Sequence, residues 1–247
     1  MGVLLASLLF FLLLHAAVAR RRRRPFHVDL RLSRGVASLL LVAAGVYALI
    51  RWFPLWPQGF LAANDEVSAA VLIAFLGGHL LADLVWLAWG ALRFGSAPRP
   101  DLVVHHLLGL AGCLCAAFLG VGYVLIAVVL TSEAMPVATG LGAWAGLAGN
   151  NRLELLAMRL QVLVLVLWRL PLWLFLLTAL AASWARGTLP GPPPTPAIAA
   201  AAFAFVAALD VYWTGECLAA EKELRAEAAK GDTIPALRRE PTHGRST

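Results

Sequence analysis

Two pairs of polar residues with catalytic side chains interrupt long apolar stretches of this chain. His105 and His106 are adjacent in DLVVHHLLGL, which begins at Asp101, and His79 precedes Asp83 by four residues. On a helix, residues four apart share a face and can touch, whereas adjacent residues point about 100° apart. A neutral imidazole can accept a proton from an amine or hydroxyl, and a carboxylate can fix its tautomer. The residue types therefore predict general-base chemistry, in which one of the two adjacent histidines points into the site.

The elements that must position these side chains are membrane-spanning helices. The chain has 247 residues, of which 61% are apolar, and its uninterrupted apolar runs are too long for the core of a soluble domain of this size. We therefore predict an all-α, polytopic membrane helical bundle of about seven transmembrane helices. The expected spans are Val3–Ala19, Val36–Ile50 (with a start nearer Leu32 as the alternative), Val67–Leu92, Leu102–Leu119, Val121–Trp144, Leu155–Trp184 and Ala197–Ala219.

Few ionisable residues lie inside these spans, and such residues are costly in hydrocarbon and seldom face lipid. They are His79, Asp83, His105, His106, Glu133, Arg169 and Asp210. At 1.5 Å per residue, Asp83 and His106 are expected about 15 Å and about 6 Å below the cytosolic edge. The polar set thus predicts a cleft that opens to the cytosol and narrows toward the middle of the membrane. Asp101, at the edge of its span, is expected to cap that helix.

Arginines and lysines are distributed unevenly between the two sides of the predicted bundle. Seventeen fall in alternate loops and the C-terminal tail, whereas the opposite loops hold only Arg51 and Arg186. Because short cytosolic loops retain positive charge, this predicts a lumenal or extracellular N-terminus and a cytosolic C-terminus. The expected membrane is the endoplasmic reticulum or the plasma membrane. The net charge of +6 follows from this topology together with affinity for anionic lipid, so we expect no nucleic-acid partner.

Three segments, taken in order, resemble the TLC-domain family, the superfamily that includes the ceramide synthases. GGHLLADLVW (77–86) is similar to its segment with an aromatic residue or a histidine four residues before an aspartate. DLVVHHLLGL is similar to its Asp-x-x-x-His-His segment, and LTSEAMP (130–136) to a Glu-containing segment of one subgroup. Arg169 followed by Pro171 is similar to a late-span feature of that subgroup. The resemblance runs from about Leu32 to about Ala219. It implies the fold and a role in lipid metabolism.

The chain departs from the ceramide synthases after the His-His pair. TSEAMPVA stands where those enzymes carry an acidic cluster, so the nearer likeness is to the subgroup linked to membrane phospholipid composition. One interpretation is acyl transfer from acyl-CoA to a lipid amine or hydroxyl, with His105, His106 and Asp83 as catalytic residues. His79, Glu133 and Arg169 would then bind substrate. The alternative is a non-enzymatic, lipid-binding regulator of membrane phospholipid composition, in which the polar residues form a hydrogen-bonded plug between helices.

The expected partners are membrane lipids, with acyl-CoA as co-substrate in the enzymatic interpretation. No cofactor and no metal are expected, since the other three histidines, His15, His27 and His243, are placed away from the site. We divide the chain into an N-terminal anchor helix with an arginine-rich loop (1–31), a TLC-like membrane domain (32–219) and a cytosolic tail (220–247). The sequence assigns no oligomeric state.

Overall fold

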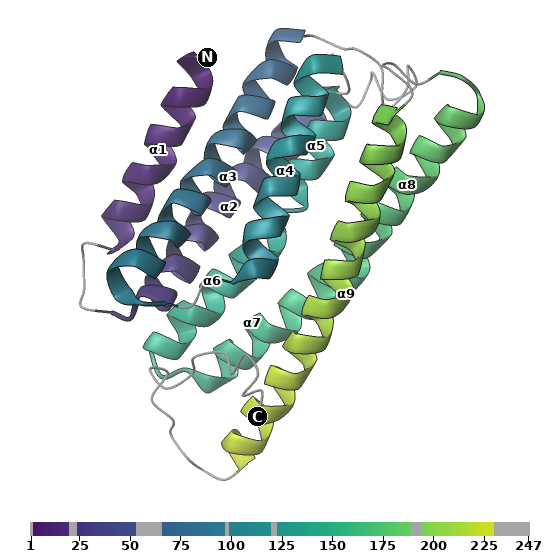
Figure 1. Cartoon of the computed structure of the whole chain (residues 1–247). Coiled ribbons are helices and arrows are strands. Elements are labelled where there is room, and N and C mark those ends of the chain that lie inside the picture. The colour runs from purple at the N-terminus through teal and green to yellow at the C-terminus, as the bar shows by residue number, and fades with distance from the viewer. Residues whose placement is uncertain are drawn as a thin grey trace.

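A computed structural model describes residues 2–19, 24–52, 66–96, 99–119, 123–188 and 194–229 (Figure 1). About 93% of these residues are helical and none is in a strand, which confirms the predicted all-α fold. Within these ranges, seven segments are long and apolar enough to cross a membrane, which confirms the predicted number of spans. The arginines at 20–23, the proline-containing loop at 53–58 and the tail beyond 229 lie outside the described residues.

The helices of the described ranges follow one another along the chain. They are α1 (Gly2–Ala19), α2 (Phe26–Trp52), α3 (Glu66–Phe94), α4 (Pro100–Leu119), α5 (Tyr123–Thr131), α6 (Ala134–Leu147), α7 (Asn151–Val164), the π-helical turn η2 (Leu165–Arg169), α8 (Leu170–Ala185) and α9 (Pro194–Ala229). One span consists of α5 and α6, and another of α7, η2 and α8. The start of α1 and the end of α9 lie at opposite ends of the bundle (Figure 1), as an odd number of spans requires.

The second helix begins much earlier than the sequence predicts. We expected it to start at Val36 or near Leu32, but α2 starts at Phe26. The polar residues that favoured a loop make contacts inside the bundle instead. Ser33 and Arg34, just before the later of the two predicted starts, contact His15 and Asp83, respectively. The charged first turns of α2 are therefore part of the helix because their side chains have buried partners.

Small residues allow several helices to approach closely. Gly35 of α2 faces Gly140 of α6, where a Cβ on Gly35 would lie 2.8 Å from the Gly140 Cα atom. Gly78 of α3 faces Ser7 of α1, where an added Cβ would lie 2.5 Å from the Ser7 Cβ atom. Such contacts are typical of helix packing in membranes, where apolar side chains gain little by leaving lipid. They bring α2 against α6 and α1 against α3.

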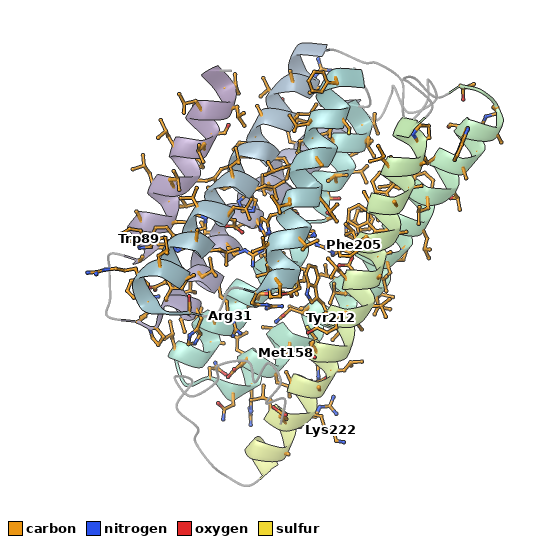
Figure 2. All side chains as sticks on the ribbon, in the orientation of Figure 1. Arg31, Trp89, Met158, Phe205, Tyr212 and Lys222 are labelled. Atoms are coloured by element: carbon orange, nitrogen blue, oxygen red, sulfur yellow. The ribbon has the colours of Figure 1, made fainter. Side chains whose placement is uncertain are left out.

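Apolar side chains cover the outside of the bundle as well as its core. Phe11, Leu41 and Leu130, from three different spans, are fully buried in one cluster. Trp89 is 51% exposed, and Figure 2 shows it on the outer side of α3, in a position to face lipid. Lys222 lies near the end of α9 in the same view. The polar residues of the spans are therefore set against an apolar exterior, as expected for a membrane protein.

Two prolines break the regular helices and change which backbone groups are free. Pro136 has no N–H to bond the carbonyl of Ser132, and α6 follows α5 after a two-residue turn at this point. Pro171 follows η2, in which the backbone N–H of Leu170 reaches back to the carbonyl of Leu165. The wider π turn directs Arg169 to the interior, where it is only 2% exposed. Arg169 thus lies beside the carbonyl of Ser132, which the missing N–H of Pro136 leaves available to it.

Candidate functional site

Four helices converge on the carboxylate of Asp83, which is completely buried on α3. Its Oδ2 atom accepts a hydrogen bond from Nε of Arg34 on α2 at 2.5 Å and lies 2.9 Å from Nε2 of His106 on α4. Its Oδ1 atom lies 3.0 Å from Nε2 of His15 on α1, within ion-pair distance, although the angle departs from that of a hydrogen bond. We call these four residues the Asp83 cluster. A buried carboxylate is thereby surrounded by donors, as its burial requires.

Both ring nitrogens of His106 are occupied. Nδ1 lies 2.6 Å from the carbonyl oxygen of Leu102 in the preceding turn of α4, and Nε2 faces Asp83 at 2.9 Å. A carbonyl oxygen can only accept a hydrogen bond, so Nδ1 carries the proton in that contact. Neither nitrogen is left to accept a proton from a substrate. In this geometry His106 holds α4 against α3, and its predicted function as a general base lacks a free nitrogen.

His79 does not join the hydrogen bonds of the Asp83 cluster, although it lies on the face of α3 that the spacing predicts. It is 1% exposed, and its ring meets the ring of Phe11 edge-on, with 5.1 Å between the centroids. Its Nδ1 atom has no hydrogen-bond partner among the described residues. His79 is therefore a packed ring beside the cluster.

A second buried ion pair joins the last two spans. Nε of Arg169 donates to Oδ2 of Asp210 on α9 at 2.9 Å, and Nη1 donates to the carbonyl of Ser132 at 2.8 Å. The indole N–H of Trp173 on α8 also donates to Asp210, at 2.8 Å. The Nη2 atom of Arg169 and the Oδ1 atom of Asp210 have no partner within the described part of the chain. We call Arg169, Asp210, Trp173 and the Ser132 carbonyl the Arg169 cluster.

His105 lies between the two clusters and is half-buried. Its ring is 5.5 Å from that of His106 and 5.4 Å from that of Trp213 on α9, measured between centroids, and both contacts are edge-on. The guanidinium of Arg169 lies over the same indole, 5.8 Å from its centroid. The Nδ1 atom of His105 is buried and has no hydrogen-bond partner among the described residues. The two adjacent histidines therefore diverge as predicted, and His105 is the one with an unpaired ring nitrogen.

Asp101 and Glu133 are placed differently from the polar residues above. Asp101 is the second residue of α4 and accepts hydrogen bonds from Nη2 of Arg99 at 2.5 Å and from the indole of Trp213 at 2.8 Å, so it joins α4 to α9. Glu133 precedes α6 and is 6% exposed. Its side chain makes no hydrogen bond to either cluster in the described residues, although the carbonyl of its neighbour Ser132 does.

Sequence reasoning missed two members of the Asp83 cluster. His15 is expected to lie away from the site, yet it contacts Asp83. It is the only ionisable residue of an otherwise apolar span, so the rule that such residues face a bundle interior would have identified it. Arg34 was counted as a loop residue because α2 was predicted to start too late. Within the described ranges, no group of three or more His, Cys, Asp or Glu residues is arranged to hold a metal ion.

Comparison with known proteins gives one match. A family model described as the TLC domain matches residues 30–218, from the first turns of α2 to the part of α9 beyond Trp213. The match covers both clusters except His15 of α1. Searches of curated proteins and of solved structures found no match.

Proposed function

The chain belongs to the TLC-domain family, and from this premise we propose that it is a lipid-metabolic membrane enzyme that transfers an acyl group from acyl-CoA to a lipid amine or hydroxyl. The observation that supports the proposal is the unpaired Nδ1 atom of His105. A buried ring nitrogen without a partner is costly in a packed bundle and suits a group that meets a substrate. Arg169 and His105 both contact the indole ring of Trp213, and Arg169 has an unpaired N–H group on Nη2.

The proposed reaction needs one base and one donor. As the amine or hydroxyl of the acceptor lipid bonds to the thioester carbon, its proton passes to Nδ1 of His105. The negative charge that develops on the carbonyl oxygen is stabilised by the N–H of Arg169 Nη2. The C–S bond then breaks, and the thiolate of coenzyme A takes the proton from His105. His105 ends neutral, so no further reactant is required.

Other residues have supporting functions in this proposal. His106 and Asp83 fix the face of α4 that carries His105, and Asp101 fixes α4 to Trp213 of α9. The arginines predicted at the cytosolic end favour the phosphates of acyl-CoA. Substrate contacts of His79 and Glu133, and the location in the endoplasmic reticulum or plasma membrane with a cytosolic C-terminus, remain predictions.

A second function has its own supporting observation. Asp83, His106, Arg34 and Asp210 are all paired with protein groups, and paired buried polar groups are a common way to hold membrane helices together. A bundle held in this way could bind lipid and regulate membrane phospholipid composition without catalysis. This second candidate differs from the first in the functions of His105 and of the free N–H group of Arg169.

The test uses the full-length protein purified into vesicles. Radiolabelled oleoyl-CoA is supplied with a lysophospholipid or a sphingoid amine, and the acylated product is measured. We expect His105→Asn to lower the rate at least about 100-fold with an unchanged melting temperature. Leu107→Ala, a 53% exposed position on the same helix, serves as the matched control and should retain the wild-type rate. The regulator would be supported instead by two results together. Wild-type protein and His105→Asn would change cellular lipid composition in the same way relative to cells without the protein, and neither would transfer acyl groups in vesicles.

A further inference from the structure

The N-terminal helix α1 precedes the region that matches the TLC domain, yet one of its faces is fully buried. Ser7, Phe11 and His15 are spaced by four residues and are the buried residues of α1. Residues at this spacing lie one above another on a helix. Leu5, Leu9 and Leu13 are about half exposed or more, so most of the remaining surface faces outward. A helix that only anchored the chain would have no need of such a face.

This buried face follows α3 residue by residue. Ser7 lies against Gly78, the ring of Phe11 meets the ring of His79, and His15 stacks on the indole of Trp86 with 5.6 Å between centroids. The contacts extend over two turns of each helix. They hold α1 in a fixed register against the helix that carries Asp83.

Each ring nitrogen of His15 lies close to a polar atom, and the contact at Nδ1 has the geometry of a hydrogen bond. Nε2 lies 3.0 Å from Oδ1 of Asp83, and Nδ1 lies 2.6 Å from the hydroxyl of Ser33 on α2. The ring is completely buried, and an imidazole in hydrocarbon is costly unless such partners offset its desolvation. A leucine would fit the apolar composition of α1 better. The two contacts are therefore the reason for a histidine at this position.

We propose that His15 is a positioning residue of the site, so that α1 completes a centre otherwise built by the TLC domain. His15 lies 3.0 Å from Oδ1 of Asp83, whereas Arg34 and His106 contact Oδ2. Arginine can bind a carboxylate through two parallel hydrogen bonds. Without His15, the carboxylate is free to rotate so that Arg34 takes both oxygens, and His106 loses its partner on α3. The effect on catalysis rests on the proposed function, whereas the effect on His106 does not.

Two substitutions separate the two contacts of His15. The amide nitrogen of glutamine corresponds to Nε2 of histidine and can reach Asp83, whereas that of asparagine corresponds to Nδ1 and reaches only toward Ser33. Full-length protein with ¹⁵N-labelled histidine rings is reconstituted in nanodiscs, and the His106 signals are identified by their loss in His106→Asn. We expect His15→Asn to shift these signals and to lower acyl transfer about 10- to 100-fold. His15→Gln should retain both the signals and the rate.

Unchanged His106 signals in His15→Asn, or equal shifts in the asparagine and glutamine variants, would overturn the proposal. Should wild-type protein transfer no acyl group, the proposed function fails, and the ring signals still decide whether His15 positions His106. Should His15→Asn not fold, Ser33→Ala replaces it, since it removes the contact that holds the other side of the ring. The His106 signals of Ser33→Ala should then shift from their wild-type positions, and unchanged signals would contradict the positioning function.

Discussion

The buried pair of Arg169 and Asp210 offers a quantitative test of the structure. Replacing Arg169 by methionine leaves the charged Asp210 with only the indole N–H of Trp173, and it leaves the Ser132 carbonyl without its donor. Pro136 cannot satisfy that carbonyl, because proline has no N–H. Both consequences oppose folding, since neither group can reach water from the interior.

The expected size follows from the burial of the pair. Its side chains are 2% and 0% exposed, and removing one partner of such a pair costs about 3–5 kcal/mol. At about 2–4 °C per kcal/mol for a chain of this size, the melting temperature should fall by about 6–20 °C. Asp210→Leu should have a similar effect. In the double variant neither charge remains. The carbonyl of Ser132 and the indole N–H of Trp173 are left unsatisfied, at about 1–3 kcal/mol each. The loss of unfolding free energy in the double variant should therefore be smaller than the sum of the losses in the two single variants.

The measurement is thermal unfolding, in one detergent, of the wild type, the two single variants and the double variant. Arg159→Met is the matched control, because Arg159 pairs with Glu221 at 2.9 Å but is 49% exposed. The Arg159→Met substitution should lower the free energy of unfolding by no more than about 1 kcal/mol. Strictly additive losses in the double variant, or a single-variant loss as small as that of the control, would refute the inferred coupling of Arg169 to Asp210.

Two further predictions concern packing and topology. Gly35→Ala should lower the melting temperature by the equivalent of about 1–3 kcal/mol, because its Cβ would meet the Gly140 Cα atom at 2.8 Å. Gly112→Ala is the control and should not lower it, because nothing lies within 4 Å of a Cβ at that position. Equal melting temperatures of the two variants would contradict the close approach of α2 and α6. In sealed membranes, protease on the cytosolic side should cut a C-terminal tag and spare an N-terminal one; cleavage of both tags would contradict the predicted orientation.

Much of the fold could be predicted because the solvent determines it. In hydrocarbon, backbone groups must bond within helices, so long apolar runs indicate both the element type and the number of spans. The start of α2 was wrong because Ser33 and Arg34 resemble loop residues until their partners on α1 and α3 are known. Helix periodicity reports which residues share a face, but not which helix that face meets.

The candidate site could be predicted in part for the same reason. The rarity of ionisable groups in spans identified Asp83, His106 and Arg169, and the structure brings each into a buried cluster. The different environments of the two adjacent histidines could not be read from their spacing, because they depend on α3 and α9. The contact of His15 with Asp83 joins residues 68 positions apart in the sequence, and neither its own helix nor the family motifs encode that pairing.

The most direct test of the proposed enzyme compares His105→Asn with His106→Asn in the same vesicle preparation, measuring both acyl-transfer rate and melting temperature. Since His105, unlike His106, has a ring nitrogen without a hydrogen-bond partner among the described residues, we expect its asparagine variant to lose activity at least about 100-fold while melting like wild type. His106→Asn should melt lower by the equivalent of about 1–3 kcal/mol, and it should lower the rate only about 10-fold, because it removes the contact with Asp83 that positions α4 but not the base. Full activity in His105→Asn, or its loss in His106→Asn with unchanged melting, would contradict the assignment of His105 as the base.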